Sequence, residues 1–234
     1  MDPIWLANLR DALLEDGTCL ALISAGSFPE WFLAASRPDW RQYLDNYCQQ
    51  IRNTVVPILA VCGSHQLVGR AFADWDAIGH MVPTDQPIPT IAEELAQSVE
   101  LIPKPRLGEV GVFPFQTCVG QEMDPLLTGL PNNPQFLEFH HDQVITGRHP
   151  GFQVLLEPDP SRSPVFWLPN DENHRNPSDV RDRCQVQAFR LKASDRVLYT
   201  TQFHPDVSAN SADVDWQSEQ LIKNFIGIAR SFWA

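Results

Sequence analysis

Cys62 stands where an apolar stretch of the sequence ends and an amphipathic stretch begins. Residues 57–61 read Pro-Ile-Leu-Ala-Val, and Gly63 and Ser64 follow the cysteine. This pattern is typical of a buried parallel strand, a tight turn and a helix. In that turn a cysteine lies at a helix N-terminus, where partial positive charge favours the reactive thiolate. The sequence therefore predicts a cysteine nucleophile in a strand–turn–helix elbow; the alternative is an inert, small buried side chain.

A histidine and an acid follow a second apolar stretch near the C-terminus. Residues 196–203 read Arg-Val-Leu-Tyr-Thr-Thr-Gln-Phe, which predicts a strand that ends at His204. Pro205 stiffens the backbone between His204 and Asp206. A cysteine nucleophile needs a histidine base, and the histidine needs an orienting acid. We therefore predict that Cys62, His204 and Asp206 form a catalytic triad.

The two motifs resemble those of the class I glutamine amidotransferases, whose catalytic set is Cys-His-Glu. The family's elbow motif is Gly-(Ile/Val)-Cys-x-Gly-His-Gln, and residues 60–66 read Ala-Val-Cys-Gly-Ser-His-Gln. The family's closing motif is Gln-Phe-His-Pro-Glu, and residues 202–206 read Gln-Phe-His-Pro-Asp. Segments 109–111, 140–144 and 184–190 are similar to three further family segments. The resemblance extends from about Leu20 to the C-terminus.

The resemblance implies a single class I glutamine amidotransferase-like domain over residues 1–234. It implies an α/β fold of the flavodoxin-like or Rossmann-like kind, a three-layer sandwich with a mainly parallel central sheet and the elbow at its carboxyl edge. The implied reaction is hydrolysis of the side-chain amide of glutamine, or of a γ-glutamyl compound, through a Cys62 thioester. Ammonia and glutamate are the implied products, and no cofactor is needed.

The same resemblance assigns roles around the cysteine. Backbone N–H groups of Gly26 and Gly63 would stabilise the oxyanion. Gln66, His141 and Asp142 would lie near the α-amino and α-carboxylate groups of the substrate. For His141 and Asp142, a polar strand end without a ligand is the alternative.

Several positions depart from the family motifs. Asp206 is one methylene shorter than the usual glutamate, and Ser64 adds a side chain where a glycine is usual. In the oxyanion loop, Ala25 and Ser27 replace a glycine and a proline. These departures predict weaker catalysis than in a typical member. They leave open a catalytically degenerate protein that acts as a binding or regulatory subunit.

The partner and the start of the chain are also left open. The chain contains no obvious synthase domain, so it either supplies ammonia to a separate synthase subunit or acts alone as a hydrolase. The stretch before Ser24 is too short for the family's first β-α unit. We expect the resulting gap in the sheet to be filled by self-association or a partner, or the chain to be part of a longer gene product. The alternative is that a helix over Ile4–Leu14 covers the gap in a monomer.

Composition excludes several classes of function. The 234 residues are 43% hydrophobic, enough for one substantial core, and the net charge of −12 disfavours binding to nucleic acid or anionic membranes. No apolar run is long enough for a transmembrane helix, and no signal peptide is recognised. The five cysteines include no Cys-x-x-Cys pair, which suits a reducing, cytoplasmic compartment.

A metal site is not expected either. Side chains that can ligate a metal are clustered at His140, His141, Asp142 and His149. Neighbouring residues of a strand point to opposite faces, so His140 and His141 are poor partners for one ion.

Apolar periodicity gives the remaining elements. Helices are expected at Ile4–Leu14, Trp40–Ile51, Thr90–Val99 and Ser218–Trp233. Strands are expected within residues 19–23, 57–62, 108–119, 134–144, 184–190 and 196–204. Residues 157–183 are polar and rich in proline, and are expected to form a long loop.

Overall fold

The computed structural model describes residues 21–26, 36–73, 78–80, 91–96, 109–118, 120, 124–140, 142–144, 151–159, 186–192 and 195–234. Several expectations fall outside these residues: the N-terminal helix, residues 160–185 of the chain, Ser27, His141 and His149. Among the described helices, none is both long and apolar enough to cross a membrane.

The described helices match the apolar periodicity. They are α3 (Pro38–Asn53), α4 (Gly63–Ala73), α5 (Ile91–Ala96), the short 3-10 helix η2 (Pro125–Leu127) and α6 (Ala212–Trp233). The start expected for the last helix, Ser218, is wrong, because α6 already begins at Ala212. Asp213 and Asp215 lie in its first turn, where carboxylates interact favourably with the helix dipole. The start at Ser218 was predicted from apolar periodicity, and this polar first turn does not belong to that apolar pattern.

Seven strands form one sheet in the order β1-β2-β9-β8-β7-β4-β5. Their bounds are β1 (Leu22–Gly26), β2 (Ile58–Cys62), β4 (Glu109–Thr117), β5 (Gln135–His140), β7 (Phe152–Pro158), β8 (Ala188–Leu191) and β9 (Leu198–Thr201). A second, two-stranded sheet pairs β3 (Ile78–His80) with β6 (Asp142–Val144).

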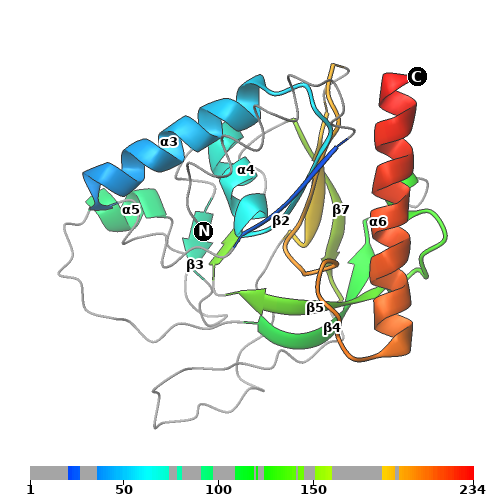
Figure 1. The fold of residues 1–234 in the computed structure, drawn as a ribbon. Helices are drawn as coiled ribbons and strands as arrows, with labels where there is room; N and C mark the ends of the chain where they lie inside the picture. Colours follow the sequence, from blue (N-terminus) through cyan, green and yellow to red (C-terminus); the bar gives the residue numbers. More distant parts are fainter. Residues whose placement is uncertain are drawn as a thin grey trace, which may run out of the picture.

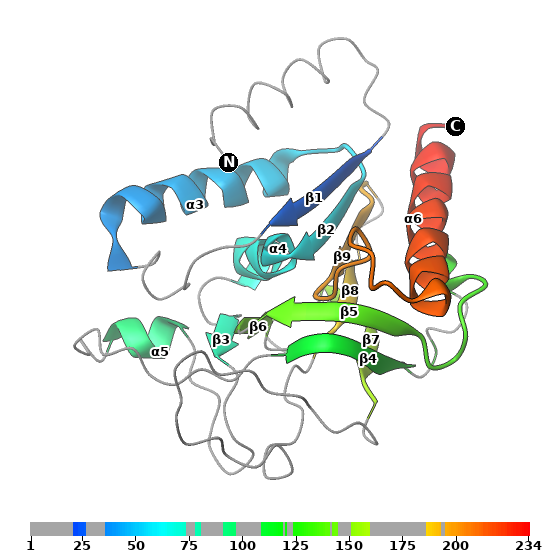
Figure 2. The ribbon, with the colours of Figure 1, turned by 60° about the horizontal axis from the view of Figure 1, so that its bottom comes forward.

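The large sheet is mixed, and its parallel part carries the elbow. β1, β2 and β9 pair in parallel, whereas every pairing from β9 to β5 is antiparallel. The expected α/β fold is confirmed, with its parallel strands confined to this group of three. The antiparallel strand β7 has no counterpart among the expected strands. In Figures 1 and 2 the sheet curls, so that β4 and β5 run across one end of the other strands.

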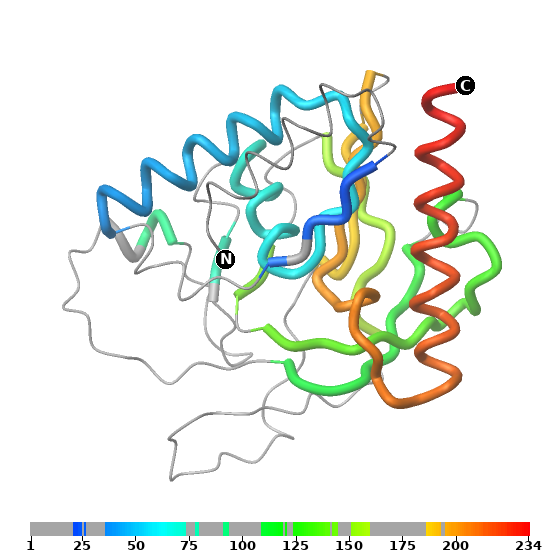
Figure 3. Tube along the Cα trace, viewed as in Figure 1, coloured from blue at the N-terminus to red at the C-terminus, as the bar shows by residue number. Residues whose placement is uncertain are grey.

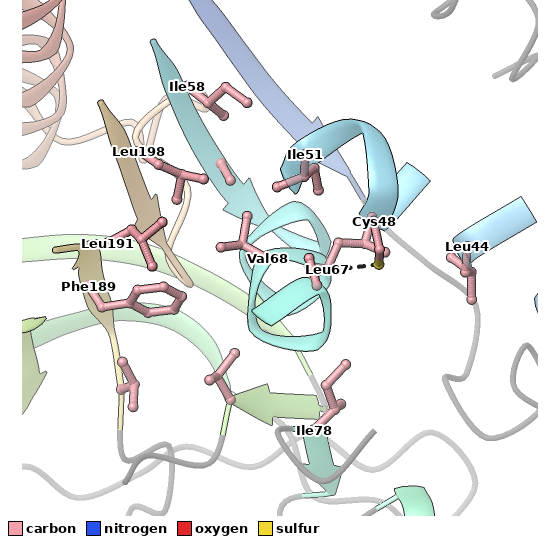
Figure 4. Packing of buried hydrophobic residues seen from close by; sticks show 14 of the residues in the cluster. Leu44, Cys48, Ile51, Ile58, Leu67, Val68, Ile78, Phe189, Leu191 and Leu198 are labelled. Carbon is pink, nitrogen blue, oxygen red and sulfur yellow. Dashed lines mark hydrogen bonds between the residues drawn. The ribbon is translucent and has the colours of Figure 1, made fainter. Parts of the chain in front are cut away.

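Helices cover both faces of the sheet, as expected for three layers. α3 and α4 lie on one side and α6 lies on the other (Figures 1 and 2). On the first side, Leu67 and Val68 of α4 pack against Ile51 of α3 and against strand residues such as Leu198 (Figure 4). Burial of these apolar side chains fixes α4, and therefore the turn that precedes it.

The core under α6 contains a stack of three buried phenylalanines. Phe136 and Phe203 lie with ring centroids 4.0 Å apart and an interplanar angle of 6°. Phe115 stacks on Phe203 with centroids 5.2 Å apart. Phe203 is fully buried and immediately precedes His204, so this stack anchors the segment that carries the histidine.

Candidate active site

Cys62 occupies a strained turn between β2 and α4. It is the last residue of β2, and α4 begins at Gly63, so the Cα trace passes from strand to helix without a linker (Figure 3). Its φ is 53°, a left-handed conformation that is uncommon for residues other than glycine. Such strain is typical of a nucleophile elbow, where it lifts the side chain off the carboxyl edge of the sheet.

His204 lies in the segment after β9. The expectation that the strand ends at His204 is wrong, because β9 ends at Thr201 and bends follow at residues 202 and 203. Phe203, which lies within this bend, packs into the core stack. The backbone N–H of His204 then donates to the carbonyl oxygen of Leu137 in β5, at 2.8 Å.

The imidazole of His204 joins the acid and the cysteine. His204 Nδ1 lies 3.2 Å from Asp206 Oδ1, and the two side chains are 16% and 26% exposed. Burial alone would lower the pKa of His204, but hydrogen bonds to Asp206 and Cys62 outweigh it and raise the pKa to about 9. Burial likewise acts to raise the pKa of Asp206, and the interaction with His204 lowers it. The three predicted triad residues therefore lie together, and the ring is charged at neutral pH.

Strand β5 contacts the side chain of Cys62. Cys62 Sγ lies 3.7 Å from the carbonyl oxygen of Phe139. The carbonyls of Leu137 and Phe139 point in the same direction, because they are two residues apart on a strand. One strand thus contacts both the histidine backbone and the cysteine sulfur.

The predicted oxyanion donors lie on either side of the cysteine. Gly26, the last residue of β1, is the register partner of Cys62. Gly63 begins α4, where the first N–H groups of a helix have no intrahelical acceptor. The hydroxyl oxygen of Ser64 lies 3.0 Å from that of Ser24, which links the elbow helix to β1.

The structure brings together two of the three predicted substrate-binding residues and places them in a buried network. Gln66 is 4% exposed, and its Nε2 donates to the backbone oxygen of Asp142 at 2.7 Å and to Gln202 Oε1 at 3.1 Å. Asp142 is 6% exposed. Gln66 thereby connects the elbow helix, β6 and the segment before His204.

Sequence reasoning missed a buried cluster at the start of β4 and the end of β5. His140 Nε2 lies 2.9 Å from both Glu109 Oε2 and Glu138 Oε2, and all three side chains are 0–2% exposed. Among the described residues, these three are the group whose donor atoms come within 4.8 Å of one another, as a metal site would require. The available signal was an acid separated by one position from a histidine on an alternating strand, as in Glu138 and His140.

The other described cysteines differ from Cys62. Cys48 and Cys118 are free, like Cys62. Burial raises the pKa of Cys118 to about 12, and burial also raises the pKa of Cys48 despite the nearby Arg70. Burial thus disfavours the thiolate at both of these cysteines.

Comparisons with solved structures identify the fold. A putative GMP synthase subunit from Thermoplasma acidophilum has a TM-score of 0.54 at 20% identity, over 91% of this chain and 74% of that one. The glutaminase domain of Trypanosoma brucei CTPS, with bound acivicin, has a TM-score of 0.52 at 15% identity, over 94% of this chain and 75% of that one. The sequence itself matches no protein-family model and no curated protein. The fold is that of the class I glutamine amidotransferases.

Proposed function

We propose that this protein hydrolyses the side-chain amide of glutamine, or of a γ-glutamyl compound, and releases ammonia and glutamate. The observation that carries the proposal is Cys62, held at a left-handed φ of 53°, together with His204, whose pKa Asp206 and Cys62 raise to about 9 and whose Nδ1 lies 3.2 Å from Asp206 Oδ1. This combination is what nucleophilic catalysis by a cysteine requires.

The chemistry follows from the arrangement. The Cys62 sulfur attacks the amide carbon, and the carbonyl oxygen accepts hydrogen bonds from the N–H groups of Gly26 and Gly63. His204, protonated at neutral pH because its pKa is about 9, donates its proton to the nitrogen as the C–N bond breaks. Water then gives a proton to His204 and attacks the thioester, which releases glutamate and restores the sulfur. Asp206 orients the imidazole throughout.

The remaining assignments belong to the same proposal. His141 and the side chain of Asp142 bind the α-amino and α-carboxylate groups of the substrate, and Gln66 positions the segment that carries them. Residues 1–234 act as one amidotransferase-like domain in the cytoplasm. The ammonia passes to a separate synthase subunit.

A catalytically degenerate binding or regulatory subunit is the second candidate. The distance from His204 Nδ1 to Asp206 Oδ1, 3.2 Å, favours it. Charged N–H···O contacts are usually about 2.7–2.9 Å long, so the acid holds the ring loosely.

Ammonium release from glutamine tests the proposal. Wild-type protein should release ammonium and Cys62→Ala should not, whereas Cys118→Ala, which removes another free cysteine, should behave as wild type. Iodoacetamide should modify Cys62 before the other cysteines, and acivicin should protect it. A folded wild type that releases no ammonium, or equal release by Cys62→Ala, would overturn the proposal in favour of the second candidate.

A further inference from the structure

Strand β5 contacts the triad through backbone carbonyl oxygens and the protein interior through alternate side chains. The carbonyl oxygens of Leu137 and Phe139 contact the His204 N–H at 2.8 Å and the Cys62 sulfur at 3.7 Å. The side chains of Glu138 and His140 alternate with them and point into the protein, where both are buried. β5 is an edge strand of the large sheet, with β4 on one side and the triad on the other. Its placement therefore depends on how the buried side chains are held.

The cluster around His140 joins β4, β5 and Gln187, the residue that precedes β8. Glu109, the first residue of β4, is the register partner of His140. Its Oε2 accepts from His140 Nε2 at 2.9 Å and from Gln187 Nε2 at 3.1 Å. Glu138 Oε2 also lies 2.9 Å from His140 Nε2. Because the cluster lies away from water, these contacts are electrostatically stronger than similar contacts at the surface.

The hydrogen-bond partners of His140 define its protonation state. His140 Nδ1 lies 2.9 Å from the backbone oxygen of Asp142, which only accepts, so Nδ1 carries a proton. Two carboxylate oxygens, each 2.9 Å from Nε2, are acceptors for a second proton there. Burial acts to lower the pKa of His140, but the charges and hydrogen bonds of Glu138 and Glu109 raise it well above its usual value.

Within the described part of the chain, His65 also interacts with His140, and it is neutral. His65 of α4 is fully buried, and its Nδ1 lies 2.8 Å from the hydroxyl of Thr200. Burial and the charge of His140 lower the pKa of His65 to about 3. The positive charge of the cluster is therefore confined to His140.

A single carbonyl oxygen connects the cluster to the elbow. The backbone oxygen of Asp142 accepts from His140 Nδ1 and from Gln66 Nε2, at 2.9 Å and 2.7 Å. Gln66 lies one turn into α4, which begins beside Cys62, and it also donates to Gln202, two residues before His204. A continuous set of hydrogen bonds thus runs from the buried carboxylates to both segments that carry the proposed nucleophile and base.

We infer that His140, as an imidazolium clamped between Glu109 and Glu138, is a positioning residue that holds β5 against Cys62 and His204. This inference rests on the proposed function and adds to it a buried ionic support for the site. Losing the clamp lets β5 shift, and a displacement of about 1 Å at a reacting centre costs on the order of a hundredfold in rate. The clamp reaches the proposed substrate-binding segment through the backbone oxygen of Asp142 and not through a side chain that binds substrate, so we expect substrate binding to change less than the rate.

Glu138→Gln tests the inference, since it keeps the shape of the side chain and removes its charge. Asp124→Asn is the matched control: Asp124 is a buried carboxylate, 5% exposed, that pairs with Arg190 at 3.2 Å away from the triad contacts. We expect Glu138→Gln to lower kcat about tenfold to a hundredfold with KM within about threefold, and to slow alkylation of Cys62 by about tenfold. Asp124→Asn should leave both the turnover and the alkylation rate within about twofold of wild type.

A measurement on wild-type protein covers the case in which Glu138→Gln does not fold. Nitrogen NMR of the histidine rings, assigned with His140→Gln, should show His140 with protons on both nitrogens at pH 8. A neutral His140, or a folded Glu138→Gln protein with wild-type alkylation of Cys62, would overturn the inference. The alkylation readout needs no glutamine hydrolysis, so absence of ammonium release in wild type counts against the proposed function alone.

Discussion

Strands β2 and β5 reach the same sulfur by different physical means. All five residues of β2 are buried, and four are apolar side chains that precede the cysteine. β5 alternates between exposed and buried positions, and its buried set includes Glu138 and His140. β2 is held by burial of apolar area, about 1.5–3 kcal/mol for a large side chain. β5 also buries Phe136, but its Glu138 and His140 are held by paired charges, and removing one partner of a buried pair costs about 3–5 kcal/mol.

The two strands therefore differ in how the positions of their site residues depend on pH. Apolar burial does not depend on pH in the physiological range, so the position of Cys62 at the end of β2 is fixed whenever the domain is folded. The β5 side depends in addition on the charges of Glu138 and His140. The segment of His204 is held in both ways. Phe203 stacks in the apolar core, and the backbone N–H of His204 donates a hydrogen bond to β5.

The largest effect is expected where these two regions meet, at His204. His204→Gln removes the base, and a positioned acid–base group contributes about a hundredfold to ten-thousandfold in rate. We expect kcat for ammonium release to fall by that factor, while Phe203 keeps the segment in place. Steady-state kinetics measures the loss, and an unchanged thermal midpoint shows that the fold is intact. A loss below about fivefold would remove His204 from the chemistry.

The next effect concerns the pH dependence of stability. The pKa of His204 is about 9, above the unfolded value near 6.5. Its contribution is therefore fully present below pH 6.5 and is lost as pH rises through 9. With about 1.4 kcal/mol for each pKa unit, the free energy of unfolding should fall by up to about 3 kcal/mol over this window.

The variant Cys62→Ala measures how much the cysteine contributes to the raised pKa of His204. The hydrogen bond and charge of Cys62 both raise the pKa of His204, so the variant should titrate closer to 6.5. Proton NMR of the ring follows the titration, and urea unfolding from pH 6 to pH 10 follows the stability. If His204 titrates identically in both proteins, the Cys62–His204 contact is absent in solution.

The β2 side of the site was predictable from sequence, for a physical reason. A continuous apolar run that ends in Cys-Gly fixes strand, turn and helix locally, and burial enforces the result. The long periodic helices α3 and α6 were predictable in the same way, although the polar first turn of α6 was not.

The β5 side was not predictable, because its contacts join residues far apart in the chain. Glu109 and His140 become neighbours only through strand pairing, and local patterns carry no information about that pairing. The end of β9 was misplaced for a related reason. The three-phenylalanine stack that turns Phe203 inward is a tertiary contact, which overrides the extended pattern of residues 196–203.

A smaller effect is expected from lengthening the triad acid. Asp206→Glu adds one methylene and lets the carboxylate approach His204 Nδ1 more closely than 3.2 Å. A better charged hydrogen bond worth about 1 kcal/mol would raise kcat roughly fivefold. Asp206→Asn, which removes the charge, should lower kcat. If Asp206→Glu also lowers it, the aspartate is adapted to this backbone and the degenerate-site interpretation loses its main support.

The smallest effect is expected at Ser64, on the β2 side. The sequence suggests that Ser64 crowds the elbow, but its hydroxyl lies 3.0 Å from that of Ser24, and the residue is only 3% exposed. Ser64→Gly removes this hydrogen bond, worth about 1 kcal/mol, and adds backbone freedom worth about 0.5–1 kcal/mol at the start of α4. Urea unfolding should show a loss of about 1–2 kcal/mol, and Ser64→Ala should show only the hydrogen-bond part. Ammonium release should not rise in either variant. If a stable Ser64→Gly protein released ammonium faster than wild type, the serine side chain would be crowding the elbow. The turn after β2 would then be more strained than its packing indicates.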